Sequence, residues 1–231
     1  MARVLICGDL HLPAVRKGYL TFCQDLYYQW DCNEVVFIGD VVDWTAISFH
    51  AAEPMCPGPL DEYKLAKECV DKWSKAFPTA KVCIGNHDER PSRLAKTVNI
   101  PDFMLIPYAK LWDTPGWDWD LKFLIDDVSY RHGSGLRGGV HPAWTTMNKI
   151  HNSVVIGHLH ARFGIEYSMV ETKRLFGMSV GCGINETEFN FAYGRDVLAR
   201  PAVGAGVVID GVPHCEPMLM SSGEPYHDSR F

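Results

Sequence analysis

The chain has 231 residues, of which 47% are hydrophobic, 12% aromatic and 22% charged. This length can bury one substantial core, and the composition is typical of a soluble globular protein and argues against a disordered chain. The net charge of −6 argues against broad, non-specific binding to duplex DNA. We therefore expect a single domain over residues 1–231.

We expect neither an export signal nor a membrane span in this sequence. The opening MARVLICGDL has an apolar run too short for a signal peptide, and Gly8 and Asp9 interrupt it. No stretch approaches the roughly 18 apolar residues needed to cross a bilayer. The eight cysteines are scattered without a CxxC pair, which favours reduced thiols over a disulfide framework. We expect a cytoplasmic protein that does not contact membranes.

The first third of the chain alternates short apolar runs with amphipathic stretches. The runs RVLIC, EVVFIG and KVCIG have the length of strands buried on both faces. Between them, residues 17–30 and 60–77 carry apolar residues at helical spacing. Asp61 and Glu62 lie in the first turn of the second helix, where the helix dipole favours acidic residues. Strands that alternate with helices predict a parallel sheet.

The second half of the chain changes its pattern. LKFLIDDVSYRHG predicts a β-hairpin, PAWTTMNKIH a helix and SVVIG a buried strand. RLFGMSVGCG and GAGVVIDGVPHCEPM predict later antiparallel strands, with a turn at Asp210 and Gly211 in the second of these stretches. Residues 53–59 and the stretch DTPGWDWD are expected to be loops. We therefore expect a parallel half and an antiparallel half that pack face to face.

Four of the apolar runs end in a glycine followed by polar side chains. These ends read GDLH, GDVVD, GNHD and GHLH. A single Asp or His after a strand is usually a cap or turn residue, but four such ends in order are hard to assemble from turn preferences. Because ligands collect beyond the carboxyl ends of parallel strands, we expect these ends to form one site.

The candidate site residues are carboxylate, imidazole and amide groups, with no thiolate among them. Mixed oxygen and nitrogen ligands suit a borderline divalent ion such as manganese, iron or zinc. Seven ligands are too many for one tetrahedral ion and suit two ions that share a carboxylate, an arrangement that clamps both oxygens of a phosphoryl displacement. The seven candidates are Asp9, His11, Asp40, Asn86, His132, His158 and His160.

The order of these motifs resembles that of the calcineurin-like metallophosphoesterases. The family pattern is Asp-x-His, Gly-Asp-x-x-Asp, Gly-Asn-His-Asp/Glu, a later His and Gly-His-x-His; the chain has GDLH, GDVVD, GNHD, RHG and GHLH between residues 4 and about 160. The resemblance implies a metal-dependent phosphoesterase with an α/β fold, a four-layer α/β/β/α sandwich of two mixed sheets. It also implies two divalent ions, with manganese as the first expectation and iron, zinc, nickel or magnesium as the others.

The same resemblance implies a role for each motif residue. His87 would not be a ligand but would face the leaving-group oxygen, and Asp43 would hydrogen-bond and orient it. A hydroxide that bridges the two ions would attack the phosphate in line. The implied ligands are Asp9, His11 and His160 for one ion, Asn86, His132 and His158 for the other, and Asp40 bridging both.

Residues outside the motifs give weaker indications of the substrate. Arg90 and Arg137 could bind a phosphate in bidentate geometry, although an exposed arginine is more often only solvated. Residues 128–174 carry 6 Lys and Arg against 2 Asp and Glu, and this local positive charge could attract a phosphate. Three tryptophans in a loop-rich segment could stack on a base or instead pack in the core, namely Trp112, Trp117 and Trp119.

These features favour a phosphodiesterase that acts on nucleic acid or nucleotides. The alternative is a phosphomonoesterase acting on a phosphoprotein or a small metabolite, because both reactions use the same metals and the same in-line attack. A third hypothesis is a non-catalytic scaffold on this fold, but such relatives tend to lose ligands and this chain keeps all of them. We expect substrate choice to come from the loops at 44–59, 99–120 and 133–145.

Overall fold

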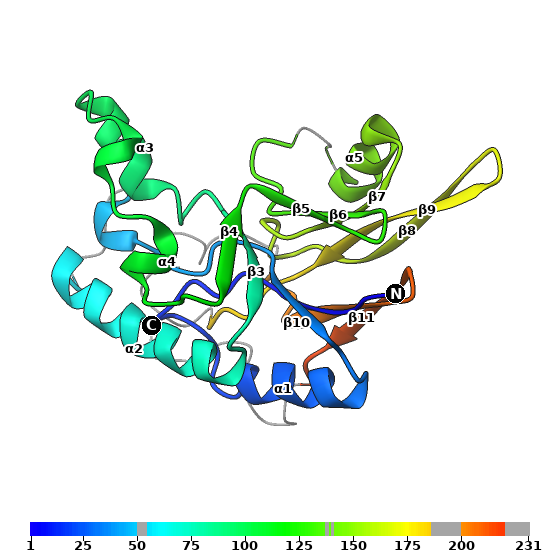
Figure 1. The fold of residues 1–231 in the computed structure, drawn as a ribbon, viewed down its shortest axis with the longest axis horizontal. Coiled ribbons are helices and arrows are strands. Elements are labelled where there is room, and N and C mark those ends of the chain that lie inside the picture. The colour runs from blue at the N-terminus through cyan, green and yellow to red at the C-terminus, as the bar shows by residue number, and fades with distance from the viewer. Residues whose placement is uncertain (50–54, 137–138, 140, 186–199, 220–231) are drawn as a thin grey trace.

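A computed structural model describes residues 1–49, 55–136, 139, 141–185 and 200–219 of the chain. These residues form two β-sheets with helices on their outer sides (Figure 1). The strands are β1 (Arg3–Cys7), β2 (Glu34–Phe37), β3 (Ala80–Cys83), β4 (Trp117–Asp120), β5 (Lys122–Ile125), β6 (Val128–Arg131), β7 (Ser153–Ile156), β8 (Phe163–Val170), β9 (Lys173–Val180), β10 (Gly204–Ile209) and β11 (Val212–Pro217). The α-helices are α1 (Tyr19–Gln29), α2 (Pro59–Ala76), α3 (Arg90–Thr97), α4 (Tyr108–Leu111) and α5 (Pro142–Ile150), and the 3₁₀ helices are η1 (Thr45–Ile47) and η2 (Asp102–Met104).

The first sheet has the strand order β11-β10-β1-β2-β3-β4. Its strands β1 to β4 run parallel, so the prediction of a parallel sheet from the first three apolar runs is confirmed. The hairpin β10–β11 is antiparallel and pairs through β10 with β1. The expectation of a separate antiparallel half was wrong here, because the last hairpin completes the parallel sheet.

The second sheet has the order β5-β6-β7-β9-β8. The predicted hairpin is present as β5–β6, with Asp126 and Asp127 in left-handed conformation at its turn. Strands β6, β7 and β9 run parallel to one another, and β8 is antiparallel to β9. This half is therefore mixed rather than antiparallel, and both sheets are mixed, as the family resemblance implied.

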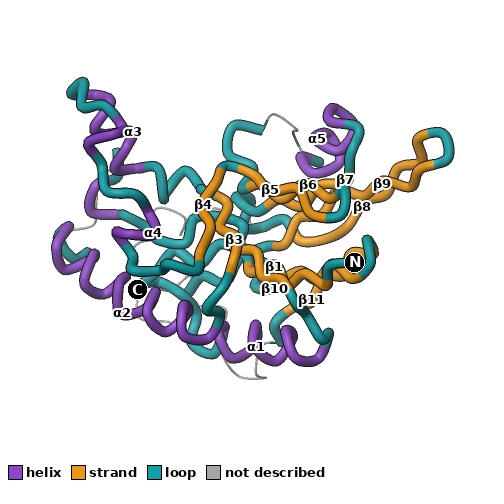
Figure 2. The backbone as a smooth tube through the Cα atoms, viewed as in Figure 1, coloured by secondary structure: helices purple, strands orange, loops and turns teal. Residues whose placement is uncertain are grey.

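Alternate residues of β1 separate the two sides of the first sheet. Leu5 and Cys7 pack in the core that α1 and α2 cover, where Trp73 of α2 is fully buried. Val4 and Ile6 pack between the sheets, in a cluster that includes residues of β6, β7 and β9. Helix α5 covers the outer side of the second sheet through Ala143 and Met147 of a third cluster. Figure 2 shows this succession of helix, sheet, sheet and helix, which confirms the predicted four-layer sandwich.

The stretch DTPGWDWD was predicted to be a loop, but its second half is strand β4. Trp117 lies opposite Ala80 of β3, is 2% exposed and donates its Nε1–H to the Phe77 carbonyl at 2.8 Å. Trp112 is also fully buried, and Trp119 stacks on Tyr108 at 4.9 Å between ring centroids. Trp112 and Trp117 are core residues, so neither offers a surface for base stacking.

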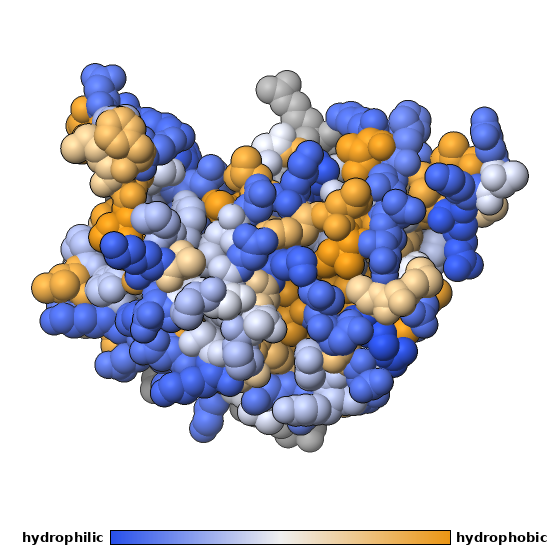
Figure 3. All heavy atoms as spheres, in the orientation of Figure 1, coloured by the Kyte–Doolittle hydropathy of each residue, from blue (hydrophilic) through white to orange (hydrophobic). Residues whose placement is uncertain are grey.

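Apolar side chains also gather outside the core, on the arm that η2 forms beyond α3 (Figure 3). Phe103 is 87% exposed, and Met104 and Ile106 are more than half exposed. Within the described residues, no helix combines the length and the apolar character needed to cross a bilayer. All eight cysteines are thiols, as predicted.

Candidate metal centre

The polar clusters of the sequence meet where the two sheets end. Asp9 and His11 follow β1, Asp40 and Asp43 follow β2, and residues 86–88 follow β3. Since these three strands are parallel and adjacent, their carboxyl ends lie along one edge of the sheet. His132 follows β6, and residues 158–160 follow β7, at the corresponding edge of the second sheet. The fold thus brings all seven predicted ligands to one place.

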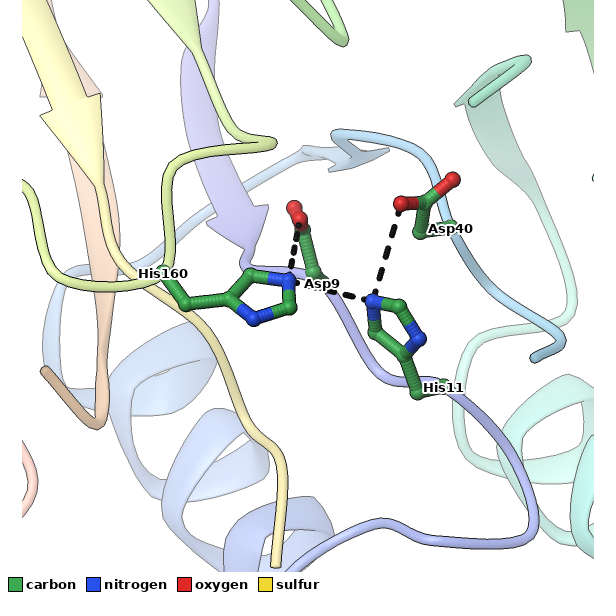
Figure 4. A group of neighbouring side chains, drawn as sticks. All are labelled: Asp9, His11, Asp40 and His160. Atoms are coloured by element: carbon green, nitrogen blue, oxygen red, sulfur yellow. Dashed lines mark hydrogen bonds and ion pairs between the residues drawn. The ribbon is translucent and has the colours of Figure 1, made fainter. Parts of the chain in front are cut away.

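The first group consists of Asp9, His11, Asp40 and His160, whose ligand atoms lie within 4.8 Å of one another (Figure 4). The Nε2 atom of His160 lies 3.2 Å from Asp9 Oδ2 and 3.1 Å from His11 Nε2. Asp9 and His11 are fully buried. Two imidazole nitrogens and two carboxylates that face one point form a donor set that fits a divalent cation.

A hydrogen bond fixes which nitrogen of His11 faces this point. Its Nδ1 lies 2.7 Å from Asp43 Oδ1. Although burial works against the charge of Asp43, hydrogen bonds from His11 and His87 hold the pKa of that carboxyl well below its usual range. An ionised carboxylate can only accept, so His11 donates from Nδ1. Burial also lowers the pKa of His11, which leaves Nε2 with a lone pair for a metal ion.

The second group consists of Asp40, His132 and His158, with Asn86 beside them. His132 Nδ1 lies 3.1 Å from the Ile38 carbonyl, and Nε2 lies 3.2 Å from Asp40 Oδ2 and 3.1 Å from Asn86 Oδ1. Burial opposes a charge on His132, but the carboxylates of Asp40 and Asp9 raise its pKa to about 10. The carboxylates therefore favour a positive charge near His132 Nε2, and a bound divalent ion would supply this charge in place of a proton.

Asp40 lies between the two groups. Its Oδ2 atom is 3.6 Å from His11 Nε2 and 3.2 Å from His132 Nε2, whereas Oδ1 accepts the backbone N–H of His87 at 2.8 Å. Burial works against its charge, but His132 and the other nearby histidines hold its pKa well below the usual range. The carboxylate is therefore ionised, with one oxygen facing both groups, the geometry of a bridging ligand.

The glycines that open the motifs leave room for these carboxylates. A Cβ atom on Gly85 would lie 2.2 Å from Asp40 Oδ1, and one on Gly157 would lie 2.3 Å from Asp9 Oδ1. Any side chain at either position would displace a carboxylate. The Gly-Asn-His and Gly-His-x-His sequences thus begin with glycine because a carboxylate that follows another strand lies against that backbone: Asp40 after β2 in the first case, and Asp9 after β1 of the other sheet in the second.

His87 lies beside the two groups, with Asp43 behind its ring. Its Nδ1 lies 2.8 Å from Asp43 Oδ1, and its Nε2 lies 3.9 Å from Asp40 Oδ2. Burial lowers the pKa of His87, but Asp43 and Asp40 outweigh it and the net shift is upward. Arg90 donates to the Asp43 carbonyl at 2.7 Å and places Nη2 3.2 Å from His87 Nε2. Arg90 thus reaches the site, whereas Arg137 lies outside the described residues.

Two buried carboxylates that support the site had no functional role in the sequence analysis. Asp88 is 1% exposed and accepts the N–H of Gly85 at 2.9 Å and of Val42 at 3.1 Å, so it ties the β2 and β3 loops together. Burial and the nearby charge of Asp40 raise its pKa to about 7. Glu62 binds the β2 loop from helix α2. The only sequence signal was that Asp88 completes the Gly-Asn-His-Asp motif; nothing local marked Glu62.

Comparison with known protein families matches residues 2–162 to the calcineurin-like phosphoesterases. No curated protein sequence matches the chain. Among solved structures, a Vps29 mutant from Entamoeba histolytica is 14% identical with a TM-score of 0.46, over 94% of this chain and 98% of that one. The phosphoesterase Yfce from E. coli is 13% identical with a TM-score of 0.43, over 91% and 90% of the two chains.

Proposed function

Since the chain belongs to the calcineurin-like phosphoesterase family and is a metal-dependent phosphoesterase, we propose that it is a phosphodiesterase acting on nucleic acid or nucleotides with two divalent ions. The observation that supports two ions is the position of Asp40, whose Oδ2 faces His11 Nε2 at 3.6 Å and His132 Nε2 at 3.2 Å. One carboxylate oxygen between two sets of nitrogen and oxygen donors suits a pair of metal ions.

The chain's own residues would hold these ions in fixed positions. The buried hydrogen bonds of His11 to Asp43 and of His132 to the Ile38 carbonyl orient both rings. When bound, the ions, for which we propose manganese, would act as Lewis acids on water and on the phosphoryl oxygens. The proposed ligands are Asp9, His11 and His160 in one group, Asn86, His132 and His158 in the other, and Asp40 in both.

We assign His87 to the leaving group. Asp43 holds its Nδ1–H, and the raised pKa of His87 favours a second proton, on Nε2, once the Arg90 Nη2 donor 3.2 Å from that nitrogen turns to the substrate. From Nε2 this proton can pass to the leaving-group oxygen. Arg90 lies beside the same nitrogen, so its guanidinium would bind a phosphoryl oxygen once substrate enters. Arg137 keeps its predicted role in phosphate binding as part of this proposal.

The charges around the site favour a diester substrate. Arg90 already donates to the Asp43 carbonyl, so it is partly committed to the protein and offers limited support for the second negative charge of a monoester. A diester carries one negative charge and needs less such support. A nucleic-acid substrate agrees with Arg93, which continues the positive charge along α3 from Arg90, whereas Lys96 on the same helix lies 3.4 Å from Asp102.

Two chromogenic substrates test the diester proposal. The protein loaded with manganese is expected to hydrolyse bis-p-nitrophenyl phosphate faster than p-nitrophenyl phosphate, and to cleave a short oligonucleotide. Asp40→Asn is the control, because it removes the shared carboxylate charge and is expected to abolish both activities. A strong preference for the monoester would contradict the proposal and support a phosphomonoesterase.

A further inference from the structure

Helix α2 contributes a buried acid to the surroundings of the site. Glu62 lies in its first turn and is only 1% exposed, whereas the side chain of its neighbour Asp61 is 72% exposed. Glutamate is almost never fully buried unless its charge has partners. Burial raises the pKa of Glu62, so an ionised form in this position needs donors to support it.

The partners of Glu62 are two backbone N–H groups of the loop that follows Asp43. Thr45 donates its N–H to Oε1 at 2.7 Å, and Ala46 donates its N–H to Oε2 at 2.9 Å. These residues begin the short helix η1, whose first N–H groups have no partner within the helix. Between them and Asp43 lies Trp44, in the left-handed region with φ 54°, which a tryptophan rarely adopts. The loop therefore depends on outside contacts for this conformation.

A further hydrogen bond carries this support to the site. The Thr45 hydroxyl donates to Asp43 Oδ2, and the other oxygen of Asp43 faces His87 Nδ1 at 2.8 Å. Glu62 fixes the backbone of Thr45, and Thr45 fixes the plane of the Asp43 carboxylate. We propose that Glu62 is a positioning residue that aligns Asp43 and, through it, the ring of His87; this inference rests on the leaving-group role proposed for His87.

Asp61 gives a matched control for the charge of Glu62. Both residues stand in the first turn of α2, so both interact with the helix dipole. Asp61 points to solvent, with Lys64 3.9 Å away. Glu62→Gln and Asp61→Asn each replace a carboxylate by an amide in the same turn. Only the first affects the loop, because an amide has one acceptor oxygen and its NH₂ group would oppose the second backbone N–H.

The test compares phosphodiesters whose leaving groups differ in acidity. If Glu62 acts through His87, Glu62→Gln should lower kcat by about tenfold to a hundredfold for an alkoxide leaving group, which needs a proton, and less for p-nitrophenolate. Asp61→Asn should change either rate less than about twofold. Hydrogen exchange should show faster exchange of the Thr45 and Ala46 amides in Glu62→Gln alone, and circular dichroism shows whether the variants are folded.

Two further sets of variants keep the test decisive. Should Glu62→Gln fold poorly, Thr45→Val removes the hydroxyl that binds Asp43, and Thr45→Ser should restore activity. Asp43 also holds His11 Nδ1, so this comparison is made at saturating manganese, which offsets any effect of the variants on that ligand. In a His87→Ala background under these conditions, Glu62→Gln or Thr45→Val should add less than about twofold to the loss, because the remaining effect acts through His87.

Each contrary result has a distinct meaning. If His87→Ala loses rate with poor leaving groups but Glu62→Gln and Thr45→Val match the wild type, the inference about Glu62 is overturned and the role of His87 stands. Fully additive losses would likewise overturn it, since Glu62 would then act by another route. If His87→Ala keeps the wild-type rate for all leaving groups, the proposed role of His87 fails, and the positioning role fails with it.

Discussion

Replacing Gly157 by alanine should weaken metal binding without unfolding the protein. The new Cβ would lie 2.3 Å from Asp9 Oδ1 and 2.5 Å from Ile38 Cγ2, whereas ordinary contacts begin at 3.4 Å. The difference, 3.4 − 2.3, requires a movement of about 1.1 Å. One obstructing atom is a carboxylate oxygen and the other is the branch methyl of the buried Ile38, so both side chains must shift, at a cost of about 1–3 kcal/mol. Asp9 would then leave its positions 2.9 Å from the His158 N–H and 3.2 Å from His160 Nε2.

The size of the effect follows from the role of Asp9 in the first ligand group. A displaced ligand should lower metal affinity by about tenfold to a hundredfold. At a fixed excess of manganese, this reduces the stabilisation by metal by about 1.4–2.8 kcal/mol. For a chain of this length, each kcal/mol corresponds to about 2–4 °C in Tm. Thermal unfolding with and without manganese therefore separates the packing cost from the loss of metal.

Gly58 supplies the control for this experiment. A Cβ on Gly58 would meet no atom within 4 Å, so Gly58→Ala should keep the metal-induced shift in Tm. If Gly157→Ala retained the wild-type shift and the wild-type activity, Asp9 would not be a ligand held against Gly157, and the reasoning from close packing would be refuted.

Three further predictions concern the site and the core. His87→Ala should lower kcat by about 10²–10⁴-fold while metal content stays unchanged, because His87 is placed as a proton donor and not as a ligand; loss of metal measured by mass spectrometry would contradict this. The carboxylates of Asp40 and Asp9 raise the pKa of His132 to about 10 against the effect of burial, so an ion that binds Nε2 displaces a proton at neutral pH. Metal affinity should therefore rise with pH, by up to about tenfold per unit between pH 6 and 8, and calorimetry that shows no such rise would argue against His132 as a ligand. Trp112→Ala should cost about 3–5 kcal/mol in urea unfolding, because this side chain is 1% exposed; a near-neutral change would mean that it is not a core residue.

The parallel part of the fold could be predicted because its strands are continuous apolar runs that end in glycine. Strand β4 could not be predicted, because its four residues Trp117–Asp120 are too short a run of alternating apolar and polar side chains and follow a Pro-Gly turn. Their pairing with β3 is a tertiary contact that the local sequence does not show. The last hairpin was recognised as a hairpin, but its sheet was not, since an antiparallel pair can extend the edge of either sheet. The local sequence pattern thus predicts most strands and helices, but the strand with which each edge strand pairs depends on contacts between residues far apart in the sequence.

The site shows the same division between local and distant information. The predicted ligands follow strands directly, so their positions along the chain reveal their position in space. Glu62 lies on a helix 19 residues beyond Asp43, and in the sequence it resembles Asp61, an ordinary acid of a first helical turn. Only the folded structure shows that one of the two is buried against the loop. Residues such as Glu62, which only hold other residues in place, do not lie at a fixed distance from a motif, so the sequence pattern cannot identify them.

The loop after β2 explains why buried carboxylates surround this site. The regular strand β2 ends at Phe37, and beyond it only an isolated bridge joins Val42 to Leu12, although the chain stays buried through Trp44. The N–H groups of Val42 and Thr45 therefore have side-chain acceptors in place of a neighbouring strand. Asp88 accepts from Val42 at 3.1 Å, and Glu62 accepts from Thr45 at 2.7 Å. Asp43 lies between these two fixed points, so the hydrogen bonds that satisfy the backbone also hold the carboxylate that His11 and His87 share.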